Sequence, residues 1–408
     1  MSGDLRTGGR SLRGLRRVVA GALLAGAVMT PGVAAADSRV APAAVAGQER
    51  PGVQRAIQAF VDAGFAGVQA RVRDERGEWV GTAGVRKLGA SAKPPANGSF
   101  WAGSVTKSFV ATVVLQLVAE GEIGLDEPVA GHLPEFGLDE RITVRMLLQH
   151  TSGLYNYTGE LGPDGVFVPG VAASGKEWVD NRFRSYEPAE LVRFALAKPA
   201  RFEPGAGWSY SNTNYTLAQL LVEQLTGRPL GEELQRRILK PLGLRNTMLP
   251  GDRTTLPGPH AHGYYRYQDG EEWKVVDVSR QNLSVVEGAG DILSTTADLQ
   301  TYFSALNKGR LLPAALLAEM RVPHPDSAGL FGRYGLGTYV LDTGSDCAGV
   351  IVNHNGSPPG GYGALMYSSL DGSRTLTASL TSGDADVNVG AVFPGLLDGL
   401  VKEVFCGS

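Results

Sequence analysis

The chain contains 408 residues, of which 43% are hydrophobic and 19% are charged, and its formal net charge is -3. This length is sufficient for one large domain, or for two smaller ones, with a substantial core. The slightly acidic balance and the lack of a basic stripe argue against nucleic acid as a partner.

The N-terminal segment differs in composition from the rest of the chain. Residues 1–17 contain five arginines and one aspartate, and the apolar run VVAGALLAGAVM and the small-residue segment TPGVAAADS follow. This order is typical of a secretory signal peptide over residues 1–36, with cleavage after Ala36. A retained anchor is the alternative, although the apolar run is short for a bilayer span. We therefore expect a secreted, extracellular protein without a membrane anchor after signal removal, and Arg16 and Arg17 leave twin-arginine export open.

A helix and a strand pair are expected after a flexible lead-in over residues 37–50. Residues 53–64 have the apolar spacing of an amphipathic helix, which Gly64 would end. Residues 66–85 alternate as two strands around a tight turn. The stretch WAGSVTKSFVATVVLQLVAEG, residues 101–121, then predicts a helix that is apolar on most of its surface and is therefore buried.

The middle of the chain, about residues 121–259, contains mainly helical patterns joined by loops rich in Gly and Pro. Strand patterns return after about Gly263, and helices are expected among them at 295–309 and 391–405. These strands are expected at 263–268, 272–279, 333–342, 349–356, 363–370 and 374–382. Strands that follow one another through tight turns form antiparallel sheets. We predict a single mixed α/β (α+β) catalytic domain over residues 51–408, with a central antiparallel sheet flanked by helices and an inserted all-helical region.

The two cysteines are Cys347 and Cys406. In an exported protein a lone pair of cysteines is expected to form one disulfide, and two buried free thiols are the alternative. The bridge would tie the C-terminus to the strand region before His354. Closing a loop of this size contributes about 4 kcal/mol in the chain-entropy model.

Ser104 and Lys107 are the first candidates for chemistry. Their i, i+3 spacing places both side chains on one face of a helix. At the first helical turn, unpaired N–H groups and the helix dipole favour an oxyanion. A hydroxyl beside a desolvated, neutral amine is an activated nucleophile. The alternative is an N-cap serine followed by a surface lysine, because S-x-x-K alone is a weak signal.

Tyr210 and Asn212, in GAGWSYSNTNY, form a second candidate group. Residues two apart point the same way in an extended segment. A phenol with a lowered pKa can shuttle a proton, and an amide can hold a substrate carbonyl or the lysine. Y-x-N alone is a weaker signal than S-x-x-K.

A third candidate group follows the apolar strand VIVN and consists of His354, Asn355, Gly356 and Ser357. A glycine at this position lets a substrate lie against the strand backbone. The backbone N–H of Ser357 can then pair with that of Ser104 as an oxyanion hole. A lone histidine at a strand end is more often structural than catalytic.

The three motifs in this order are far more specific than any one of them. S-x-x-K is a mark of serine β-lactamases and penicillin-binding proteins. The chain resembles this family, in the branch of the class C β-lactamases and the secreted, soluble D-alanyl-D-alanine carboxypeptidases. The resemblance extends from about Val53 to Cys406, and includes LLQHTSGL (147–154), FEPGAGWSYSNTNY (202–215) and GAGDILSTTADLQTYFSAL (288–306).

The resemblance implies an acyl-enzyme mechanism without a metal or organic cofactor. Ser104 would attack the carbonyl of an amide, ester or β-lactam, while Lys107 and Tyr210 pass its proton to the leaving group. Asn212 would position Lys107 and the substrate, and His354 would shape the oxyanion wall and tune Tyr210. The implied protein is a monomeric D-Ala-D-Ala carboxypeptidase-like hydrolase of peptidoglycan stem peptides, with a β-lactam or an ester as the alternative substrate.

Two departures from the family pattern weaken recognition of a substrate carboxylate. Where many members have Lys-Thr-Gly, this chain has His354, mostly neutral at pH 7, and Asn355. The soluble peptidases also place arginines after a Tyr-Gly-Leu-Gly, whereas residues 334–337 are followed by Thr, Tyr, Val and Leu. These differences leave an esterase, or a peptidase of another specificity, open.

Other observations favour simpler interpretations. His260 and His262 have no third metal ligand at a recognisable spacing, so we interpret them as loop structure. His150 is interpreted as a brace for a turn. A non-catalytic sensor of peptidoglycan fragments is the alternative from another functional class, but a pure binder has no need of Ser104 and Lys107 together with a tyrosine.

Overall fold

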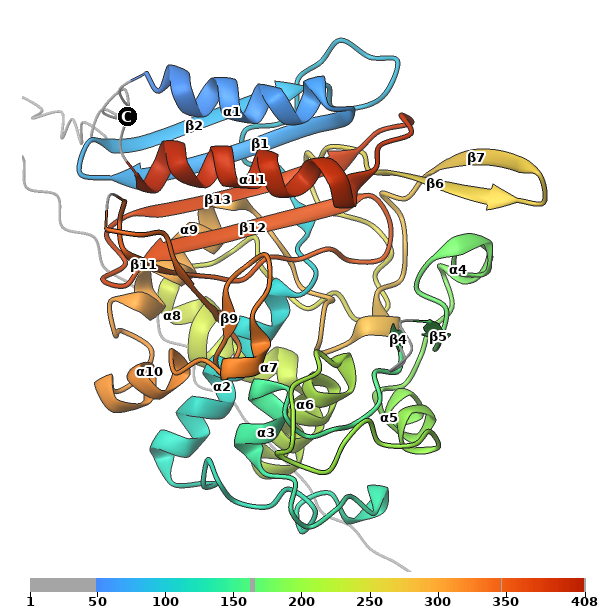
Figure 1. Ribbon diagram of the computed structural model, residues 1–408, viewed down its shortest axis with the longest axis vertical. Helices are drawn as coiled ribbons and strands as arrows, with labels where there is room; N and C mark the ends of the chain where they lie inside the picture. The colour runs from blue at the N-terminus through green and yellow to red at the C-terminus, as the bar shows by residue number, and fades with distance from the viewer. Residues whose placement is uncertain (1–48, 162–165, 346, 407–408) are drawn as a thin grey trace, which may run out of the picture. The chain divides into compact units, whose positions relative to one another are not determined.

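The computed structural model describes residues 49–161, 166–345 and 347–406. The predicted signal peptide, and the predicted lead-in up to residue 48, lie outside the described residues. A seven-stranded sheet with the order β2-β1-β13-β12-β11-β10-β9 forms the centre of the fold (Figure 1). Its strands are β1 (Phe65–Asp74), β2 (Gly77–Gly84), β9 (Arg333–Tyr334), β10 (Tyr339–Asp342), β11 (Val350–Asn353), β12 (Tyr362–Ser369) and β13 (Thr375–Ser382). All neighbouring strands are antiparallel, which confirms the predicted sheet.

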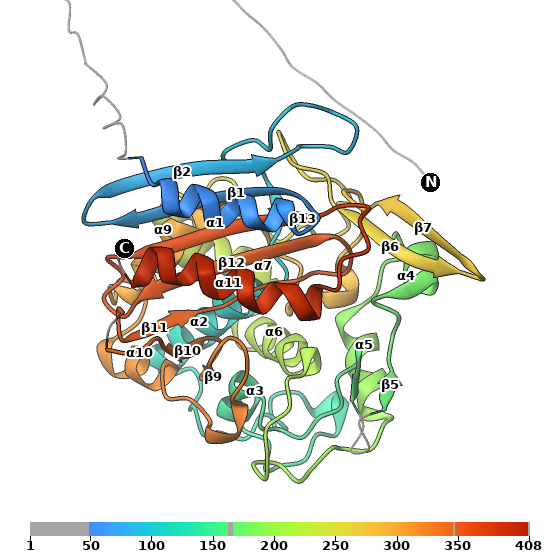
Figure 2. The same cartoon turned by 45° about the horizontal axis from the view of Figure 1, so that its top comes forward.

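Helices cover both faces of this sheet, and its strands β12 and β13 are buried on both sides. Helices α1 (Pro51–Asp62) and α11 (Val389–Phe405) lie side by side on one face, as Figures 1 and 2 show. They bury Val68, Ala70 and Val72 of β1, the alternating residues of the predicted strand. Helix α9 (Thr296–Asn307) packs against β12 and β13 on the opposite face.

The buried helix predicted from the opening stretch is α2 (Val105–Glu120), and its side chains from Val105 to Leu115 are all buried. It packs against the helical middle of the chain and ends at Gly121 in a left-handed conformation. The other helices of this part are α3 (Val144–Gln149), α4 (Gly175–Asn181), α5 (Pro188–Leu196), α6 (Asn212–Thr226), α7 (Leu230–Leu234) and α8 (Lys240–Leu242), and α10 (Ala314–Met320) follows α9 later in the chain. Within the described residues, the structure contains no helix with the length and apolar character needed to cross a bilayer.

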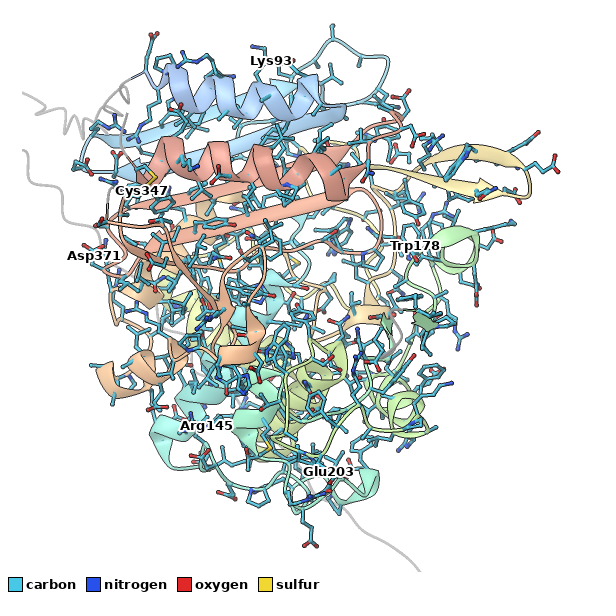
Figure 3. The ribbon with its side chains drawn as sticks, in the orientation of Figure 1. Lys93, Arg145, Trp178, Glu203, Cys347 and Asp371 are labelled. Atoms are coloured by element: carbon cyan, nitrogen blue, oxygen red, sulfur yellow. A yellow bond between two sulfur atoms is a disulfide. The ribbon has the colours of Figure 1, made fainter. Side chains whose placement is uncertain are left out.

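The strands expected at 263–268 and 272–279 are present but do not join the central sheet. They form a separate ribbon of β6 (Tyr264–Asp269) and β7 (Glu272–Asp277). Neither face of β7 packs into a core, and its apolar side chains Trp273 and Val275 are 56% and 42% exposed. The ribbon is held by α4, where Trp178 packs edge-on against a tyrosine of β6 (Figure 3).

Two further strand pairs are short. One joins β4 (Gly159–Leu161) to β5 (Phe167–Pro169), and the other joins β3 (Phe100–Trp101) to β8 (Leu293–Ser294). The second pair matters for the chemistry because β3 ends directly before the Ser104 segment.

The predicted disulfide is present and joins Cys347 to Cys406 (Figure 3). It connects the turn between β10 and β11 with the C-terminal end of α11, across 59 residues of sequence. The two elements that it joins belong to the sheet and to the helix layer that covers the sheet.

Replacing both cysteines by serine is expected to lower the free energy of unfolding by about 4 kcal/mol, because the open chain has more unfolded conformations. Urea unfolding of wild type and of Cys347→Ser/Cys406→Ser under non-reducing conditions measures this difference. Wild type with the disulfide reduced is the control and should resemble the double variant. Equal stability of oxidised wild type and the double variant would contradict a stabilising role.

Candidate active site

Strand β3 and the start of α2 position Ser104. The Ala102 N–H donates to the Ile292 carbonyl at 2.9 Å, which extends the β3–β8 pair to the turn at Gly103. Gly103 has φ = 57°, and a Cβ there would lie 2.8 Å from the Ser357 nitrogen, so both conformation and space require glycine. Ser104 precedes the first residue of α2, but its side chain makes no capping hydrogen bond. Instead it borders a pocket of about 640 Å³, so the N-cap alternative does not describe this serine.

Lys107 is not a surface lysine, since it is 0% exposed. Its Nζ lies 3.2 Å from Ser104 Oγ, 2.7 Å from Asn212 Oδ1 and 2.7 Å from the Ala289 carbonyl. Burial lowers the pKa of the Lys107 amine well below its usual range, and the negative charge of Asp291 acts in the opposite direction.

The hydrogen-bond partners of Lys107 determine where the lone pair of a neutral amine points. A neutral amine has two N–H bonds and one lone pair. The Ala289 carbonyl and Asn212 Oδ1 only accept, and they take the two hydrogens. The lone pair is then left for the proton of the Ser104 hydroxyl, which is the arrangement of a general base beside a nucleophile.

Asn212 is held so that its oxygen faces Lys107. It is the first residue of α6, and its backbone N–H donates to Asn156 Oδ1 at 3.0 Å. Its Nδ2 donates to Thr158 Oγ1 at 3.1 Å, which leaves Oδ1 for the amine. The sequence placed Asn212 beside the lysine but contained no signal for the loop that orients the amide.

Tyr210 lies on the extended segment before α6, and Lys107 Nζ is 4.7 Å from its ring centroid. Tyr210 lines the pocket and is half-buried, so protein atoms replace part of the water around its side chain. This loss of solvation raises the pKa of the Tyr210 phenol well above its usual range, and a hydrogen bond with the Ser104 side chain acts in the opposite direction. The sequence interpretation used a phenol of lowered pKa, whereas the structure holds a protonated one that can donate.

The third motif lies against the Ser104 turn through backbone atoms. A Cβ on Gly356 would lie 1.9 Å from the Ala102 carbonyl oxygen and 2.9 Å from the Ser104 nitrogen, so only glycine fits. Among the described residues, neither the Ser104 nor the Ser357 backbone N–H donates a hydrogen bond. Two unpaired N–H groups at one wall of the pocket can stabilise the oxyanion of a tetrahedral intermediate.

His354 is fully buried and forms a neutral part of this wall. Its Nδ1 is 2.9 Å from the Asn355 carbonyl, which can only accept, so Nδ1 bears the proton. Its Nε2 lies 3.1 Å from the Tyr334 hydroxyl. Burial, followed by the charge of Lys107, lowers the pKa of His354 to about 3. The hydrogen-bond partner of this histidine is Tyr334, and a direct effect of His354 on Tyr210 stays a prediction.

Because of this lowered pKa, His354 is expected to make the protein less stable as the pH falls from about 6.5 toward 3. The unfolded imidazole takes up a proton near pH 6.5, while the folded one stays neutral down to about pH 3. The stability difference between wild type and His354→Gln should therefore change by about 1.4 kcal/mol per pH unit within this window. Urea unfolding at pH 4, 5 and 6 measures it, and a constant difference would contradict the buried neutral state.

Asn355 points away from His354, as successive residues of an extended segment do. Its Nδ2 donates to the Tyr367 hydroxyl at 2.6 Å, in the core beneath α1 and α11. The side chain of this residue therefore does not reproduce the hydroxyl of a Lys-Thr-Gly motif beside the nucleophile.

Beyond the motif residues, the pocket is lined mainly by aromatic and aliphatic side chains. These are Phe65, Tyr264, Tyr265, Phe331, Tyr339, Tyr362, Leu365, Leu380, Val387 and Phe393. Among the described lining residues, Arg266 alone has a guanidinium or ammonium group, and it pairs with Asp386 at 2.6 Å. The sequence did not identify this apolar lining, because its members come from segments far apart in the chain.

Comparisons with known proteins agree with this geometry. The family model described as Beta-lactamase matches residues 53–390. A D-stereospecific amidohydrolase from Streptomyces sp. is 35% identical, with a TM-score of 0.76, over 88% of this chain and 100% of that one. A D-amino acid amidase from Ochrobactrum anthropi SV3 is 25% identical, with a TM-score of 0.72, over 87% of this chain and 98% of that one. A penicillin-binding protein of Bacillus subtilis (strain 168) is 27% identical over 69% of this chain. The matched part spans 60% of that relative's length.

Proposed function

Because this chain belongs to the β-lactamase family of serine hydrolases, we propose that it is an amidohydrolase that cleaves D-configured amino-acid amides or peptides through an acyl-enzyme on Ser104. The observation that supports this most directly is the buried amine of Lys107, whose Nζ lies 3.2 Å from Ser104 Oγ and whose pKa is lowered by burial. We infer the D-configuration from the likeness to the D-stereospecific amidohydrolase from Streptomyces, because this likeness extends over the whole length of that protein.

The proposed acylation step uses three groups. Lys107 accepts the Ser104 proton as Oγ forms a bond to the substrate carbonyl carbon. The carbonyl oxygen becomes an oxyanion, which the Ser104 and Ser357 N–H groups stabilise. The C–N bond then breaks, the Tyr210 hydroxyl gives its proton to the departing amine, and Lys107 returns a proton to Tyr210.

Hydrolysis of the acyl-enzyme repeats these steps with water as the nucleophile. The water loses a proton to the Lys107–Tyr210 pair and attacks the ester carbonyl, and Ser104 Oγ leaves with that proton. The same N–H groups of the wall stabilise the second oxyanion. The products are a carboxylic acid and the free enzyme.

The neutral wall of the pocket argues for a leaving group without a carboxylate. His354 stays neutral at all pH values above about 3, and Asn355 donates to a tyrosine in the core. A carboxylate placed beside the scissile bond would lose water without gaining a positive partner, which costs free energy. A simple amide or an ester needs no such partner.

A D-Ala-D-Ala carboxypeptidase is the second candidate. The motif order and the likeness to a penicillin-binding protein support it. Arg266 provides a positive charge on the same pocket, which the side chains of the third motif do not supply. We also propose that the protein is secreted, since a disulfide is typical of oxidising compartments.

Product release from four substrates tests the proposal. We expect ammonia from D-phenylalanine amide faster than from L-phenylalanine amide, and faster than D-Ala from an acyl-D-Ala-D-Ala peptide. Faster release of D-Ala would support the carboxypeptidase, and hydrolysis of p-nitrophenyl acetate alone would support an esterase. Equal rates for the D- and L-amides would overturn the stereochemical part of the proposal.

A further inference from the structure

His150 occupies an unusual backbone conformation directly behind the site. It ends α3 with φ = 66°, and among the described residues no other side-chain-bearing residue has a positive φ. This left-handed conformation is unfavourable for residues other than glycine. It persists only where the surrounding structure fixes it, and such positions concentrate at functional sites. His150 is 0% exposed, so its fixed conformation acts within the core.

His150 holds the backbone on both sides of Tyr210. Its carbonyl oxygen accepts the N–H of Ser209 at 3.0 Å, and its Nδ1 accepts the N–H of Ser211 at 3.3 Å. Its ring lies against the Tyr210 ring, with centroids 4.3 Å apart and planes tilted by 43°. One residue therefore contacts the segment before, at and after the phenol.

The left-handed conformation explains how one residue makes all three contacts. It turns the chain at the end of α3, so that both the carbonyl and the side chain of His150 face the segment 209–211. Nδ1 also lies 3.2 Å from Asn214 Nδ2, which anchors the histidine to the first turn of α6. The ring thus connects α3, the Tyr210 segment and α6.

We propose that His150 is the positioning residue that fixes the Tyr210 hydroxyl beside Ser104. This inference rests on the proposed function, because it assigns His150 an effect only through the proton transfer by Tyr210. Nδ1 must be unprotonated to accept from Ser211, so the imidazole has to stay neutral. Burial is the largest cause that lowers the pKa of His150 well below its usual range.

A double-mutant cycle separates positioning from general stability. Glycine adopts the left-handed conformation without strain, so His150→Gly keeps the backbone but loses both the Nδ1 acceptor and the ring. Asparagine also tolerates this conformation, and its Oδ1 can accept from Ser211. Each is combined with Tyr210→Phe, and His132→Asn, at a half-buried histidine paired with Glu127, is the control.

The measured quantity is kcat/KM for release of ammonia from D-phenylalanine amide, which reports acylation of Ser104 and, unlike an ester with a nitrophenolate leaving group, requires the proton that Tyr210 supplies. We expect H150G to lower it about 10- to 100-fold, because small misplacements of a catalytic group have effects of this size. H150N should recover most of the loss, and H132N should match wild type. In the Tyr210→Phe background, H150G should add less than about a twofold further loss, since interacting residues are not additive.

Full additivity of H150G and Tyr210→Phe would overturn the inference, and so would a normal acylation rate in a thermally destabilised H150G. If H150G does not fold, the double-mutant cycle is made with H150N, which lacks the imidazole ring. A loss of rate in H150N that is equally large in the Tyr210→Phe background would also overturn the inference. Wild type that forms no adduct on Ser104 would refute the proposed function itself, which distinguishes that failure from a failure confined to His150.

Discussion

Ser104→Ala is expected to lower kcat by roughly 10⁴- to 10⁶-fold, the range seen when a nucleophile of an acyl-transfer enzyme is removed. Ser104 Oγ is the hydroxyl beside the base Lys107, and the two unpaired N–H groups lie at the wall of the same pocket. The residual rate would come from the oxyanion wall and substrate binding alone.

Intact-protein mass spectrometry after incubation with a p-nitrophenyl ester measures this directly. Wild type should gain the mass of the acyl group, and Ser104→Ala should not. Ser108→Ala is the matched control, since Ser108 is a buried serine one turn further along α2. Its partner Tyr302 keeps a hydrogen bond to Thr112 at 2.9 Å, so this variant should fold and form the adduct. An adduct on Ser104→Ala would refute the assignment of the nucleophile.

Lys107→Met is expected to lower the acylation rate roughly 10²- to 10⁴-fold, the usual contribution of general-base transfer, because Lys107 Nζ is the base beside Ser104 Oγ. Methionine has a similar length and carries no charge, so it fits the buried site. The cost in stability comes from Asn212 Oδ1 and the Ala289 carbonyl, each of which loses its donor. An unsatisfied buried group costs about 1–3 kcal/mol.

The pH dependence of acylation provides the second readout for Lys107. Only the unprotonated amine can accept the Ser104 proton, so the wild-type rate should fall as the pH decreases through the lowered pKa of this lysine. Lys107→Met has no such group, so its residual rate should lack this acidic limb. The measurement is the burst rate of p-nitrophenyl acetate between pH 5 and 9. An identical acidic limb in both proteins would show that another group is the base.

The sequence predicted the parts of the site that depend on side-chain type and local spacing. Ser104 and Lys107 lie on one helix, where a spacing of three residues fixes their relation in any context. Gly356 was expected to let a substrate lie against the strand backbone, and the structure places it against the Ala102 carbonyl instead. In each case the local conformation limits which residue can occupy the position.

The parts that the sequence could not predict depend on main-chain atoms and long-range packing. The Ala289 carbonyl that binds Lys107 has no sequence signal, because every residue has a carbonyl. Tyr334 was noted only for the absence of a cation after its motif, yet it is the hydrogen-bond partner of His354. The β6–β7 ribbon has the alternation of a sheet strand, and only the packing of the folded chain decides that it stays outside the central sheet.

The burial of Lys107 has a consequence for when this chain becomes reactive. In the unfolded chain water surrounds the lysine, which is then an ordinary cation, and Ser104 has the low reactivity of any serine. Folding removes that water, takes the charge from the amine and so turns the serine into a nucleophile. Ser104 of a nascent or damaged chain is therefore unreactive. No separate inhibitor or cleavage is needed to keep the chain inactive before its core has formed.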